Sequence, residues 1–414
     1  RIGVCYQKSI ENFDVLMKFS RNMRNLGTET AFKVSMEANS HSKTGKKVYP
    51  FHLGDINIET PLSIRDATIR YMNNNKNGYC PSEGVMELRQ VLANDIGTKR
   101  SIQYNEGNVV IQPGGKPTIW KFLACIMDKG DEVLYPNPGY PIYESQIRYQ
   151  SGVPIPYGYI QNKNGFVIDI DKLRSSVSKN TVAFIYNNYQ NPTSASSSKS
   201  EMEELAKICI ENDLWVLSDE AYYEIRYSNL PPLSIASIPG MKERTVILYT
   251  FSKRFAMTGW RVGASIGPKT IVKQIAKLNI NDESCTNHFI QCALASVMDK
   301  IDKDAELILD ELRYRRDTCV KLLNSIRGIS LPTPDSTFYL YLNVDELMKS
   351  KNILQIEKFR IEVLKNTGVA FCTRNHFGSS NISQDKNYIR LAYSGINSEA
   401  IEEGLMCFKN WIEN

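Results

Sequence analysis

The segment Thr250-Phe251-Ser252-Lys253-Arg254-Phe255-Ala256-Met257-Thr258-Gly259-Trp260-Arg261-Val262-Gly263 decides how this chain is interpreted. It follows the apolar run 246–249, which is typical of a buried strand. Lys253 therefore stands at the carboxyl end of a strand, where α/β folds bind ligands and where desolvation favours a Schiff-base lysine. Thr250, Ser252 and Arg261 are suited to grip a phosphate. The alternative is a lysine and an arginine on a solvated loop.

Polar residues also follow two other predicted strands, 182–186 and 214–217. A buried carboxylate such as Asp219 needs a partner, and a protonated pyridine nitrogen would serve. Tyr222 is placed to bond the phenolic oxygen of such a ring, and the amide of Asn191 can donate to the same oxygen. The alternatives are a helix N-cap for Asp219 and a functionless Asn-Pro turn at Asn191.

Two further segments suit a phosphate and an aromatic ring. Gln112-Pro113-Gly114-Gly115-Lys116-Pro117 joins the predicted strand 109–112 to a helix, so backbone N–H groups can approach a phosphate there. It is not a Walker A loop, because proline follows the lysine. Tyr140, after the predicted strand 132–135, is suited to stack on a heteroaromatic ring.

The order of strands and helices predicts an α/β fold. Strand–helix alternation through the middle of the 414 residues favours a mostly parallel, doubly wound sheet. After residue 300, a charged helix at 302–326 leads to predicted strands at 337–342 and 388–393, which favours a smaller α+β part. We expect a large domain at 62–300 and a small domain formed by 1–61 and 301–414.

Together these segments resemble the class I/II aminotransferases of fold type I, a family of pyridoxal-phosphate (PLP) enzymes that includes aspartate aminotransferase. The resemblance runs from about residue 27 to the end of the chain. It extends to three segments that the motifs above do not cover: Phe51-His52-Leu53-Gly54, Asn77-Gly78-Tyr79-Cys80-Pro81-Ser82-Glu83-Gly84 and Tyr388-Ile389-Arg390-Leu391.

The resemblance implies a role for each candidate residue. Lys253 would form a Schiff base with PLP and move the substrate proton, Asp219 would pair with the pyridinium, and Tyr222 and Asn191 would bond the phenolic oxygen. Tyr140 would stack on the ring. The phosphate would be held by a larger set: Gly115, Lys116 through its backbone, Thr250, Ser252, Arg261, and Tyr79 from the neighbouring subunit of a homodimer.

The resemblance also implies a reaction, the ping-pong transfer of an amino group from an L-amino acid to a 2-oxo acid. Arg390 would bind the substrate α-carboxylate, with Gly54 and Asn191 beside it, and Lys116 would favour aspartate or glutamate. Glu29 argues against an acidic substrate, unless it is a surface or capping acid. Two departures from the family, Ser194 and the run Gly54-Asp55-Ile56-Asn57, lie near the substrate mouth.

Other functions on this scaffold stay open. The alternatives are a C–S lyase, an enzyme like ACC synthase and an amino acid oxidase, which share the first bond to the cofactor. A non-catalytic regulator is disfavoured, because no segment outside the scaffold is long enough for a DNA-binding domain.

Composition limits the partners and the compartment. A net charge of +5, without a basic block, gives no reason to expect nucleic-acid or membrane binding. Nine scattered cysteines and four histidines show neither a disulfide framework nor metal-ligand spacing. We therefore expect a cytoplasmic enzyme. Because the first residue is Arg1 rather than methionine, we expect a trimmed or processed chain, and a removed targeting segment stays open.

Overall fold

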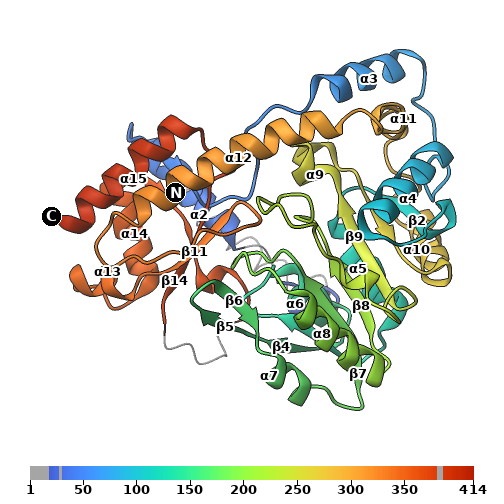
Figure 1. Cartoon of the computed structure of the whole chain (residues 1–414), viewed down its shortest axis with the longest axis horizontal. Coiled ribbons are helices and arrows are strands. Elements are labelled where there is room, and N and C mark those ends of the chain that lie inside the picture. Colours follow the sequence, from blue (N-terminus) through green and yellow to red (C-terminus); the bar gives the residue numbers. More distant parts are fainter. Residues whose placement is uncertain (1–17, 28–29, 380–385) are drawn as a thin grey trace.

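A seven-stranded sheet forms the centre of the protein (Figure 1). The structure is a computed structural model that describes residues 18–27, 30–379 and 386–414. The strands lie in the order β2 (Val109–Gln112), β10 (Gly263–Ile266), β9 (Thr245–Thr250), β8 (Trp215–Asp219), β7 (Thr181–Asn187), β3 (Glu132–Pro136) and β4 (Val153–Tyr157). Strand β10 runs antiparallel to both of its neighbours, and the other pairs are parallel.

Both faces of this sheet are buried, because apolar residues occupy consecutive strand positions. Along β9, Val246 and Leu248 pack on one face, whereas Ile247 and Tyr249 pack on the other. The first face is covered by α5 (Lys116–Ile126), α6 (Ile142–Tyr149) and α10 (Lys269–Asn281). The second is covered by α4 (Met86–Arg100), α8 (Lys199–Glu211) and α11 (His288–Val297). The expected mostly parallel, doubly wound α/β fold is confirmed.

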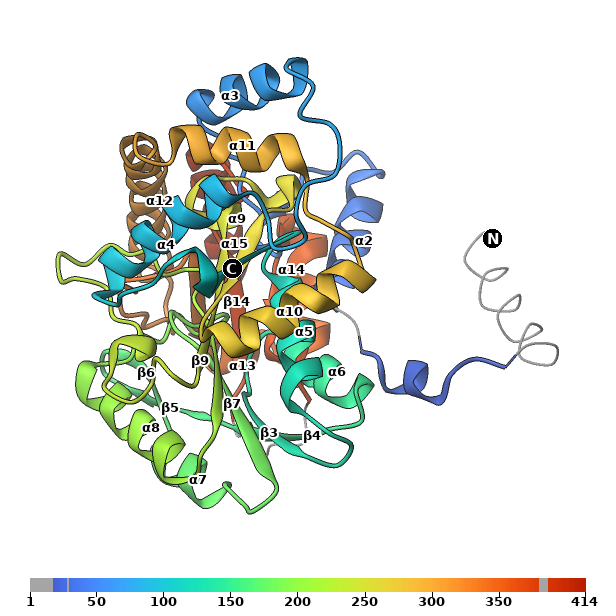
Figure 2. The same ribbon diagram turned by 90° about the vertical axis from the view of Figure 1, so that its right-hand side faces the viewer.

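The remaining elements of this large part lie around the sheet. They are α3 (Leu62–Asn73), which packs on α11, the hairpin β5 (Tyr159–Asn162) and β6 (Gly165–Ile168), α7 (Ile170–Ser175), α9 (Phe251–Arg254), and the 3-10 turns η2 (Glu106–Asn108), η3 (Ile235–Ser237) and η4 (Thr258–Trp260). Another 3-10 turn, η1 (Arg21–Asn25), lies beside α6 at the edge of the molecule (Figure 2).

A second, smaller part is built mainly from the C-terminal third of the chain. Its sheet has the order β11 (Tyr339–Asn343), β14 (Tyr388–Ala392) and β13 (Cys372–Thr373). Around it lie α12 (Asp302–Leu323), α13 (Asp345–Ser350), α14 (Ile356–Thr367), η5 (Arg374–His376) and α15 (Ser398–Glu413). Helix α12 also spans from this part toward α3 and α11 (Figure 1).

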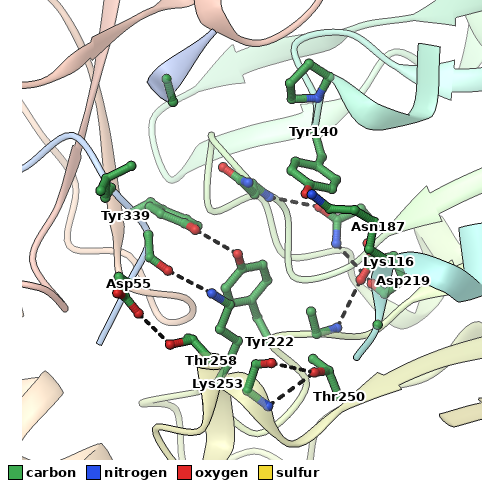
Figure 3. A pocket seen from close by; sticks show the side chains of 18 of the residues that line it. Asp55, Lys116, Tyr140, Asn187, Asp219, Tyr222, Thr250, Lys253, Thr258 and Tyr339 are labelled. Atoms are coloured by element: carbon green, nitrogen blue, oxygen red, sulfur yellow. Dashed lines mark hydrogen bonds between the residues drawn. The ribbon is translucent and has the colours of Figure 1, made fainter. Parts of the chain in front are cut away.

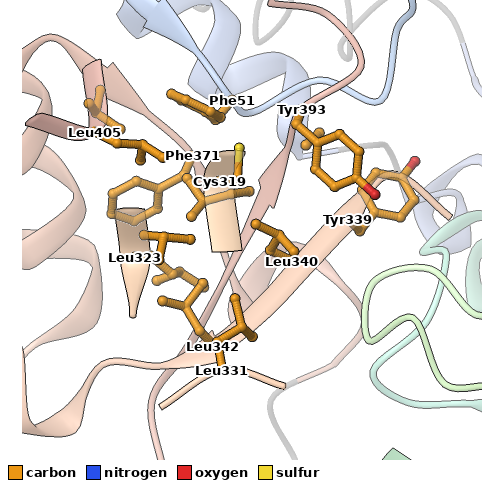
Figure 4. Packing of buried hydrophobic residues seen from close by; sticks show 14 of the residues in the cluster. Phe51, Cys319, Leu323, Leu331, Tyr339, Leu340, Leu342, Phe371, Tyr393 and Leu405 are labelled. Atoms are coloured by element: carbon orange, nitrogen blue, oxygen red, sulfur yellow. The ribbon is translucent and has the colours of Figure 1, made fainter. Parts of the chain in front are cut away.

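Residues near the start of the chain join this smaller part. Strand β1 (Tyr49–Pro50) pairs in parallel with β12 (Val369–Ala370), and α2 (Ala31–Ser42) packs on α14. Figure 4 shows the shared core, in which Phe51 lies with Leu340 and Leu405. The same cluster includes Tyr189 and Tyr222 of the large part, so one apolar core reaches from the small sheet to the ends of β7 and β8.

The predicted and observed bounds differ at several elements, among them one strand and one helix of the smaller part. The strand predicted at 337–342 begins only at Tyr339, because Thr337 has a left-handed backbone with φ of 60°. The helix predicted at 302–326 ends at Leu323, and its last turn is capped at Asn324. No helix among the described residues combines the length and apolarity that crossing a membrane requires.

Candidate active site

A cavity of about 710 Å³ lies where the large sheet meets the smaller part, and residues from both parts line it (Figure 3). Strands β7, β8 and β9 end there, at Asn187, Asp219 and Thr250. All but one of the predicted site residues line this cavity: Gly54, Gly115, Lys116, Tyr140, Asn191, Asp219, Tyr222, Thr250, Ser252, Lys253, Arg261 and Arg390.

One predicted site residue does not line the cavity in this chain. The side chain of Tyr79 is 87% exposed and lies outside it. Its expected role in a neighbouring subunit therefore stays a prediction. Glu29 lies outside the described residues.

Lys253 enters the cavity from the short helix α9, directly after β9. Its ammonium Nζ donates to the backbone oxygen of Gly54 at 2.7 Å, a contact that links the large part to the segment before α3. Thr250 begins α9 as its N-cap, because its Oγ1 accepts from the backbone N–H of Ser252 at 3.2 Å. The strand-to-helix turn thus fixes the position of the Lys253 backbone, from which the side chain extends into the cavity.

Asp219 is the last residue of β8 and is buried. Tyr143 donates to its Oδ2, and the N–H of Ala221 donates to its Oδ1 at 3.1 Å. Burial raises the pKa of Asp219 to about 6, although these two donors act in the opposite direction. The helix N-cap alternative is wrong, because a turn rather than a helix follows Asp219.

Sequence reasoning missed the Tyr143 contact with Asp219. Tyr143 lies three residues after Tyr140, near the start of α6, and Asp219 is far away in the sequence. The spacing of three residues was the available signal, since the turn that leads into α6 brings both tyrosines together, with the Tyr143 N–H donating to the Tyr140 carbonyl at 3.1 Å. Their rings meet edge to face, with centroids 5.7 Å apart.

Two asparagines connect the ends of the strands with the smaller part. The Asn187 side chain donates to the backbone oxygen of Asp219 at 3.0 Å and accepts from the backbone N–H of Asn191 at 3.0 Å. The Oδ1 of Asn191 in turn accepts from Arg390 Nη1 at 2.9 Å. This contact directs the carbonyl end of the Asn191 amide at Arg390 and leaves the amide nitrogen as the group for other acceptors.

Arg390 on β14 is buried and is held on several sides. Its Nη2 donates to the backbone oxygen of His52 at 2.7 Å, and its guanidinium carbon lies 4.4 Å from the ring centroid of Tyr339 and 4.6 Å from that of Phe377. Its Nε is buried and has no hydrogen-bond partner among the described residues. Arg390 lines the cavity, and a planar guanidinium held in one orientation is suited to a carboxylate.

At the other end of the cavity, hydroxyls, a guanidinium and a helix N-terminus lie together. Gly114 has φ of +97°, a conformation that side chains rarely adopt, and a Cβ built on it would lie 2.0 Å from Arg261 Nη2, so glycine leaves this space to the guanidinium. Arg261 Nη1 donates to the oxygen of Thr258 at 2.7 Å, and Thr250 Oγ1 donates to Ser252 Oγ at 2.9 Å. With the N-terminus of α5, these groups can hold a phosphate.

Other residues in the cavity carried no assignment from the sequence. Thr258 Oγ1 donates to Asp55 at 2.6 Å, and the hydroxyls of Tyr339 and Tyr222 lie 2.7 Å apart. His376 also lines the cavity; its Nδ1 accepts from the backbone N–H of Thr373 at 3.1 Å, and burial lowers its pKa, which favours the neutral ring with its proton on Nε2. Tyr339 and His376 belong to no motif that sequence alone distinguishes from a core residue.

The chain is similar to known aminotransferases along nearly its whole length. The sequence profile "Aminotransferase class I and II" matches residues 46–406. A probable aspartate/prephenate aminotransferase of Aquifex aeolicus is 30% identical over 387 residues, covering 92% of this chain and 95% of that protein. The aspartate aminotransferase of Bacillus subtilis is 27% identical, covering 96% and 99%. The crystal structure of an aromatic aminotransferase from Pyrococcus horikoshii has a TM-score of 0.82 at 28% identity, covering 91% and 98%.

We predict that Asp219→Asn stabilises the ligand-free protein above pH 6. In the folded protein the pKa of Asp219 is raised from 3.8 to about 6. The carboxyl group therefore contributes fully to the free energy of unfolding below pH 4, and this contribution is lost as the pH rises through 6. The amide cannot ionise, so the free energy of unfolding of the variant should exceed that of the wild type by up to about 3 kcal/mol at pH 8. Urea unfolding from pH 4 to pH 8 measures the difference.

The matched control is Asp213→Asn, whose side chain is 95% exposed. It should change the free energy of unfolding by less than about 0.5 kcal/mol at every pH. Equal unfolding free energies of wild type and Asp219→Asn at pH 8 would show that the buried carboxylate is not destabilising.

Proposed function

The chain belongs to the family of class I and II aminotransferases, and from this premise we propose that it transfers an amino group between an L-amino acid and a 2-oxo acid, with pyridoxal phosphate bound in the cavity described above. One observation carries the proposal: the amine of Lys253, the carboxylate of Asp219 and the guanidinium of Arg390 converge on a single cavity. These three groups come from the large sheet and from the smaller part, and each has the charge that one step of the reaction needs.

The cofactor, when bound, supplies an aldehyde carbon that accepts the amino group and a ring that withdraws electrons from the substrate Cα. The carboxylate of Asp219 would keep the ring nitrogen protonated. The positive charge of that nitrogen would in turn offset the cost of burying the carboxylate. Lys253 would hold the cofactor and carry the proton that leaves Cα. The hydroxyl of Tyr222 and the amide of Asn191 would donate to the ring oxygen, and Tyr140 would stack on the ring.

The phosphate would lie against the N-terminus of α5, where Gly115 and the backbone of Lys116 present N–H groups. Thr250 and Ser252 would add hydroxyl donors, and Arg261 a positive charge. The fit is supported by Gly114, whose missing side chain leaves space for the Arg261 guanidinium.

Arg390 would bind the substrate α-carboxylate. Its guanidinium lines the cavity and is oriented by its contacts with Asn191 and His52. Because amino acids and 2-oxo acids both carry this carboxylate, Arg390 would bind the amino donor and the amino acceptor alike. Gly54, whose backbone oxygen accepts from Lys253, would lie beside the substrate.

We propose an acidic amino acid, aspartate or glutamate, as the preferred substrate. Lys116 lines the cavity, with Nζ 5.7 Å from the ring centroid of Tyr140, so its ammonium can reach toward a distal carboxylate. Two relatives named above carry aspartate in their names, which supports this choice. The related structure named for aromatic substrates makes an aromatic donor the main competing outcome.

We further propose a homodimer in which Tyr79 of each subunit reaches the phosphate of the other. The exposure of Tyr79 in the single chain is compatible with this arrangement, because the ring is accessible to a neighbouring subunit. The cysteine content of the sequence supports a cytoplasmic location.

We predict that Lys253→Ala lowers turnover by on the order of 10³-fold or more, because both the covalent anchor and the proton carrier are lost. The measurement is the conversion of the bound cofactor's absorption by an amino acid alone, followed by its recovery on addition of a 2-oxo acid. Lys199→Ala, at an exposed position on α8, is the control and should behave as wild type. Release of ammonia from the wild type without an acceptor would indicate elimination instead of transfer.

We predict that Lys116→Ala is selective. The kcat/KM for aspartate or glutamate should fall about 10- to 100-fold, the loss expected for a charge-assisted contact, whereas alanine should change by less than about 3-fold. The backbone N–H at 116 is kept in this variant, so phosphate binding is not expected to change. An equal fall for acidic and neutral donors would mean that the side chain serves the cofactor or the fold.

We predict that inactive Lys253→Ala subunits regain activity when they exchange with Tyr79→Phe subunits of lowered activity. If Tyr79 acts across the interface, each mixed dimer contains one fully intact site and one doubly altered site. The recovered rate should approach half that of the wild-type dimer for each mixed dimer formed. Demonstrated subunit exchange without recovery would place Tyr79 in its own subunit's site or in a structural role.

A further inference from the structure

We propose that Tyr339 is a positioning residue that aligns Tyr222 and Arg390 together, its hydroxyl acting on the first and its ring on the second. The inference rests on the proposed function, because it concerns the cofactor oxygen and the substrate carboxylate assigned there. It adds that Tyr222 and Arg390 are both held in position by one residue, which the smaller part of the protein contributes.

The contact with Tyr222 joins the two parts of the molecule (Figure 3). Tyr339 is the first residue of β11, and it is buried. Its hydroxyl oxygen lies 2.7 Å from that of Tyr222, and the two rings meet edge to face with centroids 5.5 Å apart. Tyr222 belongs to the turn after β8, so this hydrogen bond connects the small sheet to the end of the large one.

The direction of this hydrogen bond follows from counting protons. Each phenol carries one hydrogen. Burial raises the pKa of Tyr222 well above its usual value, so the Tyr222 hydroxyl keeps its hydrogen. If Tyr222 donates its hydrogen to the cofactor oxygen, Tyr339 must be the donor within the pair. A hydroxyl that accepts one hydrogen bond becomes a stronger donor in the next, so Tyr339 strengthens the bond from Tyr222.

The ring of Tyr339 forms one wall for Arg390. The guanidinium carbon lies 4.4 Å from the centroid of this ring and 4.6 Å from that of Phe377. Aromatic rings this close attract a cation and fix the plane in which its N–H groups point. Removing the Tyr339 ring therefore leaves Arg390 with its contacts to Asn191 and His52 but without one of its two walls.

The backbone and the surroundings of Tyr339 hold it in this place. Its N–H donates to Thr337 Oγ1 at 3.1 Å, and its carbonyl oxygen accepts from Ser194 Oγ at 2.8 Å. Ser194 and Thr337 have φ of 58° and 60°, conformations that cost free energy for residues other than glycine. A Cβ on Gly54 would lie 2.3 Å from the Tyr339 hydroxyl, so glycine at position 54 leaves space for it.

The first test is Tyr339→Phe, which removes the hydroxyl and keeps the ring. With the holoenzyme, kcat should fall about 2- to 10-fold, while KM for the amino donor stays within about 2-fold. The visible absorption of the bound cofactor changes with pH, and the midpoint of this change should rise by about half a unit. A weaker hydrogen bond from Tyr222 leaves more negative charge on the ring oxygen, and this charge holds the nearby proton whose loss changes the absorption. A loss of packing alone would not move this midpoint.

The second test is Tyr339→Leu, which removes the ring as well. KM should rise about 10-fold for acidic and neutral donors alike, since the altered group binds the carboxylate that all of them share. The free energy of unfolding is measured for both variants. If Tyr339→Leu does not fold, the Phe variant still tests the hydroxyl, and Ser194→Gly, which loses the bond to the Tyr339 carbonyl, should move kcat and the midpoint in the same direction by a smaller amount.

The matched control is Tyr341→Phe on the same strand. Its hydroxyl is buried without a partner among the described residues, and its ring stacks on Tyr388 with centroids 5.0 Å apart. This variant should leave kcat, KM and the absorption midpoint unchanged. An unchanged midpoint and kcat in Tyr339→Phe, or equal changes in Tyr341→Phe, would overturn the inference. Failure of the wild type to convert its cofactor with any amino acid would instead overturn the proposed function.

Discussion

The rest of the site depends on how the buried carboxylate of Asp219, at the end of β8, is stabilised. A carboxylate that is removed from water must be hydrogen-bonded or paired with a positive charge. Tyr143 and the N–H of Ala221 meet part of that need, yet burial still raises the pKa to about 6. In the function we propose, a cationic ring nitrogen would meet the remainder and would couple the stability of this position to ligand binding.

The neighbouring strands are arranged around the same point. Asn187 at the end of β7 binds the backbone of Asp219, and Thr250 at the end of β9 starts the turn that carries Lys253. In a parallel sheet the carboxyl ends of adjacent strands lie at one edge, so residues distant in sequence meet without any special loop. The large sheet therefore supplies the groups that would act on a cofactor.

The smaller part supplies the groups that would act on a substrate. Arg390 comes from β14 and Tyr339 from β11, two strands that pair with each other. Both side chains cross to the large part, Arg390 at Asn191 and Tyr339 at Tyr222. One apolar core continues beneath these contacts (Figure 4), so the two halves of the cavity are held by packing as well as by hydrogen bonds.

The sequence by itself determined the α/β fold and the positions of Lys253, Asp219 and Asn191 at strand ends. It could do so because an apolar strand and the polar residue that follows it are adjacent in the chain, so a local pattern carries the information. The bond from Tyr143 to Asp219 joins residues 76 positions apart, and the pairing of Tyr339 with Tyr222 joins residues 117 positions apart. The ring of Tyr339 that packs on Arg390 is also distant from it in the sequence. Only the tertiary structure decided these contacts, because the same tyrosines in a sequence are indistinguishable from core residues until packing brings their hydroxyls and rings to a partner.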